Sequence, residues 1–222
     1  MRAACRCRQR RACPRLRVAA ASAGEATVDV GAGITLPLIP VRHQLFITEA
    51  IPGVAPLQPI VRLVEASVYV RYEQGGLMFG GYEDTPRVLG REGLAPGFQI
   101  AALELDLDVL RGLVDEVAAH FPALRDAKIA VHRGGAPTMT PDGRPILGRV
   151  PGLDGLFVAS GCCVGGLSLS PAAGRALADL IVDGKSDPDL GPISVERFGA
   201  APRDPAALEA ACVAQYARRY TH

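Results

Sequence analysis

The sequence contains no tryptophan, and aromatic residues make up only 5% of its 222 residues. No apolar run approaches the roughly 18–20 residues that a membrane-spanning helix needs, so we predict no membrane span. The formal net charge is +1, which gives no general reason to expect a nucleic acid or an acidic membrane as a partner. Because 49% of the residues are hydrophobic, the chain can still build a sizeable core, in one large domain or two small ones.

The six cysteines do not form spaced pairs, which argues against a disulfide-stapled secreted fold. No Cys-x-x-Cys motif or histidine-rich cluster accompanies them, and we predict no metal site. The adjacent Cys162 and Cys163 are interpreted as small packing residues, because free cysteine is often buried. A redox role is the alternative, but the sequence supplies no resolving partner for these thiols.

Residues 1–24 carry seven arginines and no acidic residue. Such a start is compatible with an organelle transit peptide, a disordered arm or a wrongly chosen start codon. Because it has neither aromatic interleaving nor a periodic face, residues 1–27 are interpreted as a basic, non-structural arm. We expect a cytoplasmic location, and the arginine-rich start leaves a mitochondrial location open as the alternative.

Strand patterns follow the arm. Residues 38–49 (LIPVRHQLFITE) are β-branched and apolar, and prolines bound them, so they predict a strand. Residues 67–73 alternate in character, the glycine pair at 75–76 predicts a turn, and LMFGGYE then predicts a second strand. This region therefore predicts a β-hairpin. The glycine pair at 80–81 indicates a bulge or a close approach by another group.

The middle of the chain predicts a helix, a strand and a turn. Apolar residues recur at spacings of three and four over residues 106–121, and Asp106 or Asp108 can cap the start of this helix. Residues 128–132 predict a short strand. Residues 141–143 (Pro-Asp-Gly) predict a tight turn, because proline presets φ and glycine supplies a positive φ.

Residues 155–184 predict a strand, a glycine-rich loop and a helix in succession. GLFVASG (155–161) is a compact apolar strand. Ser170 and Pro171 fit the N-cap and the first helical position, and Gly184 ends the helix. The last stretch, DPAALEAACVAQYARRY, is weakly helical, and we expect it to fray. Together the elements predict an α+β fold with some α/β character near the carboxyl end.

The glycine-rich loop, residues 161–168, is the clearest candidate ligand site. Where side chains are missing, backbone N–H groups can approach a ligand closely, and a helix start adds unpaired donors and roughly half a positive charge. Such a place favours an anionic or electron-rich oxygen, for example a phosphate or the pyrimidine edge of a flavin. The alternative is that the glycines only permit tight strand–helix packing, and the spacing alone leaves both interpretations open.

Residues 140–184, TPDGRPILGRVPGLDGLFVASGCCVGGLSLSPAAGRALADLIVDG, closely resemble the carboxyl-terminal part of the D-amino-acid-oxidase-like flavoprotein family. Upstream, residues 36–52 and 67–83 resemble the substrate domain of its sarcosine and dimethylglycine branch. The resemblance implies FAD as cofactor and a small amine or amino acid, such as sarcosine, dimethylglycine or a D-amino acid, as substrate. The substrate would be oxidised by hydride transfer to the flavin.

The resemblance also implies a division of the chain. Residues 28–135 would form a substrate-binding domain with a mostly antiparallel sheet and helices. Residues 136–195 would return to a Rossmann-like FAD domain as its strand-loop-helix remnant, and residues 196–222 would form a tail with a weak helix. The loop would lie along the flavin pyrimidine edge, which makes these residues the expected cofactor contacts: Gly161, Cys162, Cys163, Val164, Gly165, Gly166, Leu167 and Ser168.

The sequence departs from the family pattern in important places. No G-x-G-x-x-G loop is present to bind the FAD pyrophosphate. Ala136 stands where related oxidases have a carboxylate-binding arginine, Gly135 is nearest to the cysteine that bonds flavin covalently in some members, and Ser168 replaces an oxygen-activating lysine. We therefore expect a carboxyl-terminal portion of an oxidoreductase, with a missing FAD-domain segment or partner subunit. The alternative is a truncated, non-catalytic fragment or subunit.

Five side chains are candidates for substrate binding. Arg42 can bind a carboxylate bidentately, with an edge-strand ion pair as the alternative. His43 can act as a base near neutral pH, or it is a structural histidine. Tyr69 and Arg71 share one face of the predicted hairpin, which faces either substrate or solvent. Arg133 is placed to replace the missing carboxylate-binding arginine, with a surface ion pair as its alternative. No catalytic residue is assigned.

Overall fold

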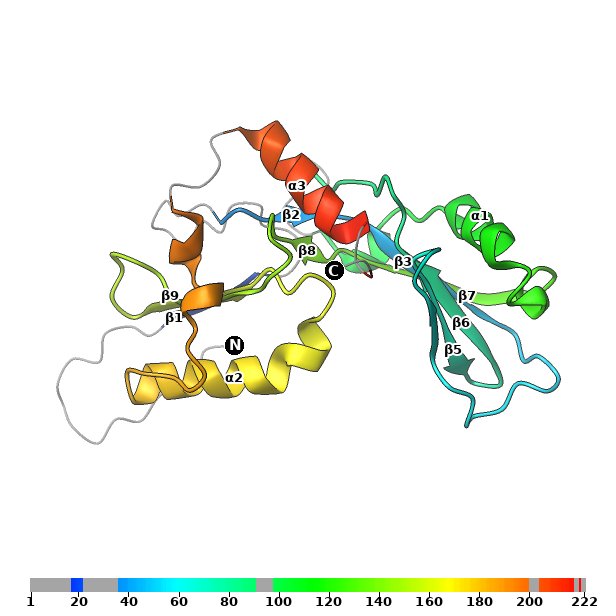
Figure 1. Cartoon of the computed structure of the whole chain (residues 1–222), viewed down its shortest axis with the longest axis horizontal. Coiled ribbons are helices and arrows are strands. Elements are labelled where there is room, and N and C mark those ends of the chain that lie inside the picture. The colour runs from blue at the N-terminus through cyan, green and yellow to red at the C-terminus, as the bar shows by residue number, and fades with distance from the viewer. Residues whose placement is uncertain (1–16, 22–35, 91–97, 200–203, 218–219, 221–222) are drawn as a thin grey trace.

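The computed structural model describes residues 17–21, 36–90, 98–199, 204–217 and 220. These residues form an elongated molecule with two halves (Figure 1). One half contains a five-stranded sheet and a helix, and the other contains a three-stranded sheet and a longer helix. The fold is α+β, as the sequence predicts.

The five-stranded sheet has the strand order β4-β5-β6-β3-β7, and all of its neighbouring strands are antiparallel. Its strands are β3 (His43–Thr48), β4 (Val61–Leu63), β5 (Val68–Glu73), β6 (Gly76–Gly81) and β7 (Ile129–Gly135). Helix α1 (Leu107–Val117) covers one face, and apolar side chains of both elements form a common core. The buried members of that core are Phe46, Val68, Val70, Phe79, Leu110, Val114, Val117 and Leu124.

The predicted hairpin is present as β5 and β6. Its two central turn residues are Gln74 and Gly75, which both have positive φ (49° and 88°), as a type I′ turn requires. The turn thus lies one residue earlier than the glycine pair suggests, and Gly76 is the first residue of β6. The register is continuous past Gly80, so the glycine there marks a close approach and not a bulge.

Helix α1 begins where its cap predicts. The Asp106 side chain accepts a hydrogen bond from the Asp108 amide at 3.1 Å, which satisfies one of the free donors of the first turn. The helix ends at Val117, four residues before the predicted end. Short 3-10 turns occur before it at η2 (Ile100–Ala102) and after it at η3 (Pro122–Leu124).

The three-stranded sheet has the order β1-β10-β9. Strand β10 (Leu156–Ser160) pairs antiparallel with β9 (Ile146–Arg149) and parallel with β1 (Arg17–Ala21). The prediction that residues 1–27 are non-structural is therefore wrong for β1, and the rest of that arm lies outside the described residues. Local pattern gave no signal, because the partner of β1 lies about 140 positions further along the chain and only the fold brings the two together.

Helix α2 (Gly166–Val182) begins one turn before the predicted start. Ser170 is therefore not its N-cap, and Pro171 lies inside the helix. The Ser170 hydroxyl donates a hydrogen bond to the Leu167 carbonyl at 3.0 Å. Because proline has no N–H, that carbonyl loses its normal partner four residues later, and the serine supplies a donor instead.

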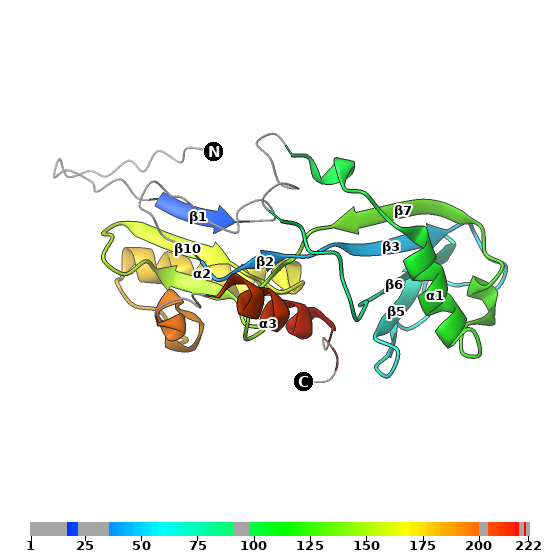
Figure 2. The same ribbon diagram turned by 90° about the horizontal axis from the view of Figure 1, so that it is seen from above.

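Three further elements lie between the halves. Strands β2 (Ile39–Pro40) and β8 (Thr138–Met139) pair antiparallel, and helix α3 (Pro205–Ala217) packs on both. Figure 2 shows β2 nearly in line with β3 and α3 beside it. The expected single strand over 38–49 is thus two strands with a break. Two further 3-10 turns, η4 (Gly191–Ile193) and η5 (Val195–Phe198), precede α3.

Helix α3 is not a loosely attached tail. Cys212 and Tyr216 have 0% exposed surface and belong to one cluster with Val41, Tyr82, Met139 and Cys163. The weak helical pattern of the sequence hides this role, since only one narrow side of α3 is buried. Among the described residues, no helix is both long and apolar enough to cross a membrane.

Candidate functional site

Four of the five predicted substrate residues lie on one face of the five-stranded sheet. Leu45 pairs with Gly80 on one side and with Arg133 on the other, and Gly80 pairs with Tyr69. Because side chains two residues apart share a face, His43 and Arg71 join Tyr69 and Arg133 there. Helix α1 covers the opposite face, so these four side chains lie on the side of the sheet away from α1.

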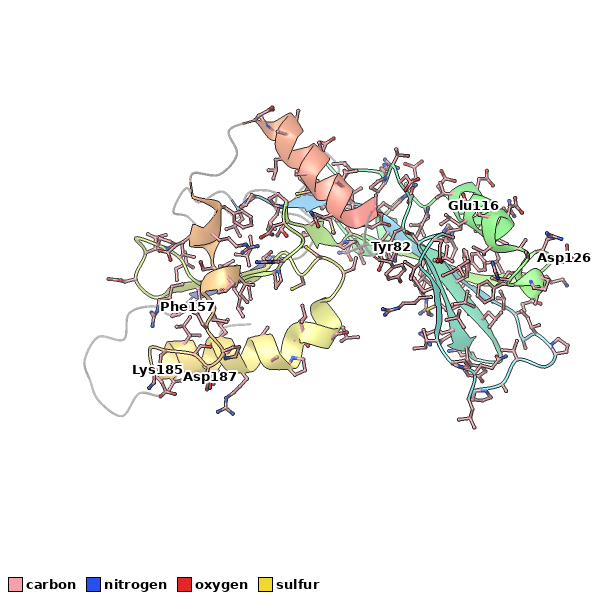
Figure 3. All side chains as sticks on the ribbon, in the orientation of Figure 1. Tyr82, Glu116, Asp126, Phe157, Lys185 and Asp187 are labelled. Atoms are coloured by element: carbon pink, nitrogen blue, oxygen red, sulfur yellow. The ribbon has the colours of Figure 1, made fainter. Side chains whose placement is uncertain are left out.

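His43 is held between tyrosines. Its Nδ1 lies 2.7 Å from the Tyr216 hydroxyl, and its Nε2 lies 3.0 Å from the Tyr69 hydroxyl. The Tyr82 ring stacks on the imidazole with 4.9 Å between the ring centroids. Figure 3 places Tyr82 where the carboxyl end of α3 meets the five-stranded sheet. Both ring nitrogens of His43 thus have partners from distant parts of the chain.

Burial keeps this group of side chains uncharged. It lowers the pKa of His43 to about 4, because the imidazolium would lose its hydration there. Burial likewise raises the pKa of Tyr69 and of Tyr216 well above that of an exposed tyrosine. At neutral pH, His43 therefore offers one donor and one acceptor, and the tyrosines act as hydrogen-bonding hydroxyls.

The two arginines on this face differ in availability. Arg71 forms an ion pair with Glu73 at 2.6 Å and donates to the Tyr72 carbonyl at 3.0 Å. Arg133 is exposed, and within the described part of the chain it has no ion-pair partner. The Tyr69 side chain reaches across β6 to His43 on β3, so its hydroxyl ends one strand away from Arg133 on β7. Among the described residues of this face, Arg133 is thus the cation that is free to meet an anionic group.

Arg42 lies elsewhere. It is 6% exposed and pairs with Glu83 at 3.6 Å, next to Gln44, on the α1 side of the sheet. Burial raises the pKa of Glu83, and the Arg42 charge opposes that effect. Arg42 is therefore separated from the other four candidates by the sheet itself, in a buried ion pair and not an edge-strand one. Four buried polar atoms have no partner in the described structure: Arg42 Nε, Gln44 Nε2, Glu83 Oε1 and His132 Nε2.

The glycine-rich loop combines packing and free donors. The Cys163 amide bonds to the Thr138 carbonyl at 3.2 Å, and the Gly165 amide bonds to the Cys162 carbonyl at 2.8 Å. Cys163 and Val164 have positive φ, 46° and 65°, which is a strained conformation for a β-branched residue such as valine. Such strain persists only where the surrounding structure imposes it.

The loop glycines are interpreted either as permitting tight packing or as exposing backbone donors to a ligand. Different positions of the loop support each interpretation. At Gly161, with φ of 62°, a Cβ would lie 2.6 Å from Thr140 Cγ2 and 2.8 Å from Leu38 Cδ2, so this glycine serves packing. The amides of Cys162 and Val164 have no acceptor among the described residues. The first-turn amides of α2 also lack intrahelical acceptors, and the amino end of α2 points toward the half with the five-stranded sheet (Figure 1).

The predicted cofactor loop and the predicted substrate residues meet in one cluster. Cys163 is buried in it, and Val164 and Tyr69 pack against it together with Tyr82 and Tyr216. Loop and sheet face are therefore neighbours, although about 95 residues separate Tyr69 from Val164 in the sequence. This juxtaposition is what makes the region a candidate site.

Cysteine chemistry in the described region is that of free thiols. Cys162, Cys163 and Cys212 form no disulfide, and the Cys163 sulfur hydrogen-bonds with Thr140 and the Gly161 carbonyl. Burial raises the pKa of Cys162 and raises that of Cys212 to about 12. Both thiols are therefore protonated at neutral pH. No group of three or more potential metal ligands is present in the part of the chain that the structure describes.

Sequence reasoning missed Tyr216. It lies in a weakly patterned helix, 173 positions from His43, and nothing local marks it as a partner of that histidine. The only available signal was an aromatic residue spaced four positions after Cys212, which is consistent with one buried side of α3.

Comparison with known proteins identifies the fold's relatives. The chain is 32% identical over 167 residues to mouse sarcosine dehydrogenase, a mitochondrial protein. The matched region covers 75% of this chain and 18% of that protein. It is also 32% identical over 170 residues to the mouse mitochondrial pyruvate dehydrogenase phosphatase regulatory subunit, at 75% and 19% coverage. The structure of glycine oxidase from Geobacillus kaustophilus matches with a TM-score of 0.66 and 28% identity, over 82% of this chain and 45% of that one.

The chain thus spans about a fifth of the length of these curated relatives and less than half of the matched structure. A family model described as FAD dependent oxidoreductase (DAO) matches residues 6–180. That match begins within the basic arm and includes β1, the loop and most of α2. FAD is the cofactor of this family, whose members act on amino-acid or amine substrates. The chain belongs to the DAO family of FAD-dependent oxidoreductases.

Proposed function

We propose that this chain is the carboxyl-terminal portion of an FAD-dependent oxidoreductase that oxidises a small amine or amino acid, such as sarcosine, dimethylglycine or a D-amino acid. The substrate would bind on the sheet face that carries His43, Tyr69 and Arg133. The observation that carries this proposal is the shared cluster in which the glycine-rich loop packs beside Tyr69.

The donors at the start of α2 fit the electron-rich edge of a flavin. Backbone amides at a helix start favour negative charge, and the amides of Cys162 and Val164 add to that set. When FAD is bound, it supplies the hydride acceptor for the amine substrate. The expected contacts then reduce to Cys162, Val164 and residues 166–168. Gly161 serves packing, and the amides of Cys163 and Gly165 are bonded to the Thr138 and Cys162 carbonyls.

The side chains on the sheet face would bind and orient the substrate. Arg133 is the free cation and would bind a substrate carboxylate. Tyr69, fixed by its bond to His43, would hydrogen-bond to the same substrate. Arg71 is engaged with Glu73, and we assign it a supporting role at most.

A further polypeptide segment must hold the FAD pyrophosphate, because the sequence has no G-x-G-x-x-G loop. Helix α2 offers an apolar surface that such a segment fits: Leu167 and Val182 are 92% and 80% exposed. Next to it lies a cavity of about 350 Å³, lined mainly by small apolar residues of α2 and by β9 and β10. We therefore propose that a missing FAD-domain segment or a partner subunit covers α2.

Flavin binding tests the proposal. The purified chain is mixed with FAD, alone and together with a segment that carries the glycine fingerprint, and is desalted before its visible spectrum is recorded. We expect retained flavin absorbance only with the added segment, and reduction of that flavin by sarcosine or a related amine. Arg133→Met should raise the KM for carboxylate substrates at least tenfold, whereas Arg111→Met on the covered side is the matched control. Flavin that is never retained would contradict the proposal.

A second candidate function is that of a non-catalytic subunit. It is supported by the similarity to a protein named as a regulatory subunit and by the missing fingerprint. This candidate predicts a folded chain that takes up no FAD under any combination and still associates with a partner. The same desalting experiment separates the two candidates.

The relatives and the arginine-rich start also bear on the location of the protein. Both of the curated relatives above are named as mitochondrial, and residues 1–24 are rich in arginine and free of acid. We therefore propose a mitochondrial location over a cytoplasmic one for a eukaryotic host. A fluorescent fusion with and without residues 1–16, a deletion that leaves β1 in place, tests this, since only the fusion that keeps these residues should enter mitochondria.

A further inference from the structure

Helix α3 contributes one side chain directly to the candidate site. Tyr216 is fully buried, and its hydroxyl lies 2.7 Å from Nδ1 of His43. The other ring nitrogen, Nε2, faces the Tyr69 hydroxyl at 3.0 Å. The Tyr82 ring stacks on the imidazole, with 4.9 Å between the ring centroids.

The hydrogen atoms of the Tyr216–His43–Tyr69 hydrogen-bond network can be arranged in two ways. A neutral imidazole carries one N–H and one lone pair, and each tyrosine carries one O–H. In the first arrangement, Nδ1–H donates to Tyr216, and Tyr69 donates to Nε2. In the second arrangement, Tyr216 donates to Nδ1, and Nε2–H donates to Tyr69. The heavy-atom distances fit both.

Burial decides between them. In the first arrangement the Tyr216 hydroxyl hydrogen needs an acceptor other than His43, and among the described residues this hydroxyl has no second hydrogen-bond partner. A buried donor without a partner costs roughly 1–3 kcal/mol. In the second arrangement Tyr216 and both imidazole nitrogens are satisfied. Only the Tyr69 hydrogen is then left over, and it lies on the sheet face away from α1, where a substrate can meet it.

We propose that Tyr216 is a positioning residue that holds His43 in the Nε2–H tautomer. Tyr69 then accepts a hydrogen bond from His43 and presents its own O–H to the sheet face as a donor. A donor beside the Arg133 cation suits an oxygen anion, so the pair would select a substrate that carries a carboxylate. The last step rests on the proposed function, whereas the tautomer does not.

Nitrogen-15 NMR of the histidine side chains tests the tautomer in the chain without flavin. The chain is labelled with ¹⁵N-histidine, and the His43 signals are assigned by their loss in His43→Gln. We expect the wild-type protein to carry the proton on Nε2. In Tyr216→Phe the donor to Nδ1 is lost, so neither tautomer has a partner at Nδ1 and the preference for Nε2–H should weaken. We therefore expect a measurable population of the Nδ1–H form, with Tyr69 donating to Nε2, in place of Nε2–H alone. In Tyr69→Phe the donor from Tyr216 remains, and Nε2–H should persist.

Each outcome decides the question. A wild-type proton on Nδ1, or an unchanged tautomer in Tyr216→Phe, overturns the proposal. Should Tyr216→Phe fail to fold, Tyr69→Phe still decides, because a switch to Nδ1–H there would make Tyr69 the controlling group. A confirmed tautomer without flavin uptake leaves this inference standing and removes only the proposed function.

Discussion

The ring of Tyr69 lies directly over Gly80, its cross-strand neighbour on β6. A Cβ at position 80 would collide with the Tyr69 hydroxyl and ring. Glycine is therefore the residue that lets Tyr69 lie flat across β6 and reach His43 on β3. The sequence predicted a bulge or a close approach at this glycine pair, but it did not identify the group that approaches.

Gly80→Ala should push Tyr69 away from His43. We expect a loss of about 1–3 kcal/mol in unfolding free energy, as for other overpacked sites, together with a changed His43 environment. Urea unfolding and the His43 NMR signals measure the two effects. Gly135→Ala is the control, because Gly135 pairs with His43 on the other side and a Cβ there meets open space. Equal effects of the two substitutions would contradict the steric role of Gly80.

Acid should destabilise the protein through His43. The folded protein holds its pKa at about 4, against 6.5 in an exposed chain, so the unfolded chain binds more protons between these values. The unfolding free energy should fall by up to about 3 kcal/mol as the pH drops from 6.5 to 4. Thermal unfolding of wild type and His43→Gln at several pH values measures this. The difference between the two isolates His43 from Glu83, whose raised pKa acts in the opposite direction.

Breaking the buried Arg42–Glu83 pair should be costly. Arg42→Met leaves an uncompensated buried carboxylate, and we expect a loss of about 3–5 kcal/mol. The double variant Arg42→Met, Glu83→Leu should recover most of this loss, because no charge is left buried. Arg111→Met removes an exposed pair with Asp108 and should change stability by less than about 1 kcal/mol. A double variant no more stable than Arg42→Met would show that packing, and not charge, sets the cost.

Ser170 and Pro171 should be energetically coupled. Pro171→Ala restores the missing N–H inside α2 and should stabilise the protein by about 1–3 kcal/mol. Ser170→Ala should cost up to about 1 kcal/mol in the wild type, where its hydroxyl serves the Leu167 carbonyl. In the Pro171→Ala background, we expect that cost to vanish, because the carbonyl regains a backbone donor. Chemical denaturation of the four variants gives the coupling directly, and strictly additive effects would refute it.

Sequence patterns predicted secondary structure correctly where the conformation of a segment depends mainly on its own residues. The hairpin is an example, since alternation and a glycine turn specify both strands without outside help. Helix α1 is another, because Asp106 caps it and its apolar stripe meets the sheet. The start of α2 was predicted wrongly, because Ser170 and Pro171 imitate a helix start while a serine-to-carbonyl bond allows the helix to continue through proline.

The order of residues was enough to predict the family, the hairpin and the glycine-rich loop, because these depend on neighbouring residues and on short motifs. It also named His43, Tyr69 and Arg133, but it could not separate them from Arg42. The folded chain was needed to show that Arg42 lies on the other side of the sheet, that β1 pairs with β10, and that Tyr216 reaches His43. Local patterns cannot predict these contacts because they join residues far apart in the chain. Their energy comes from burial and hydrogen bonding that exist only once the fold has formed.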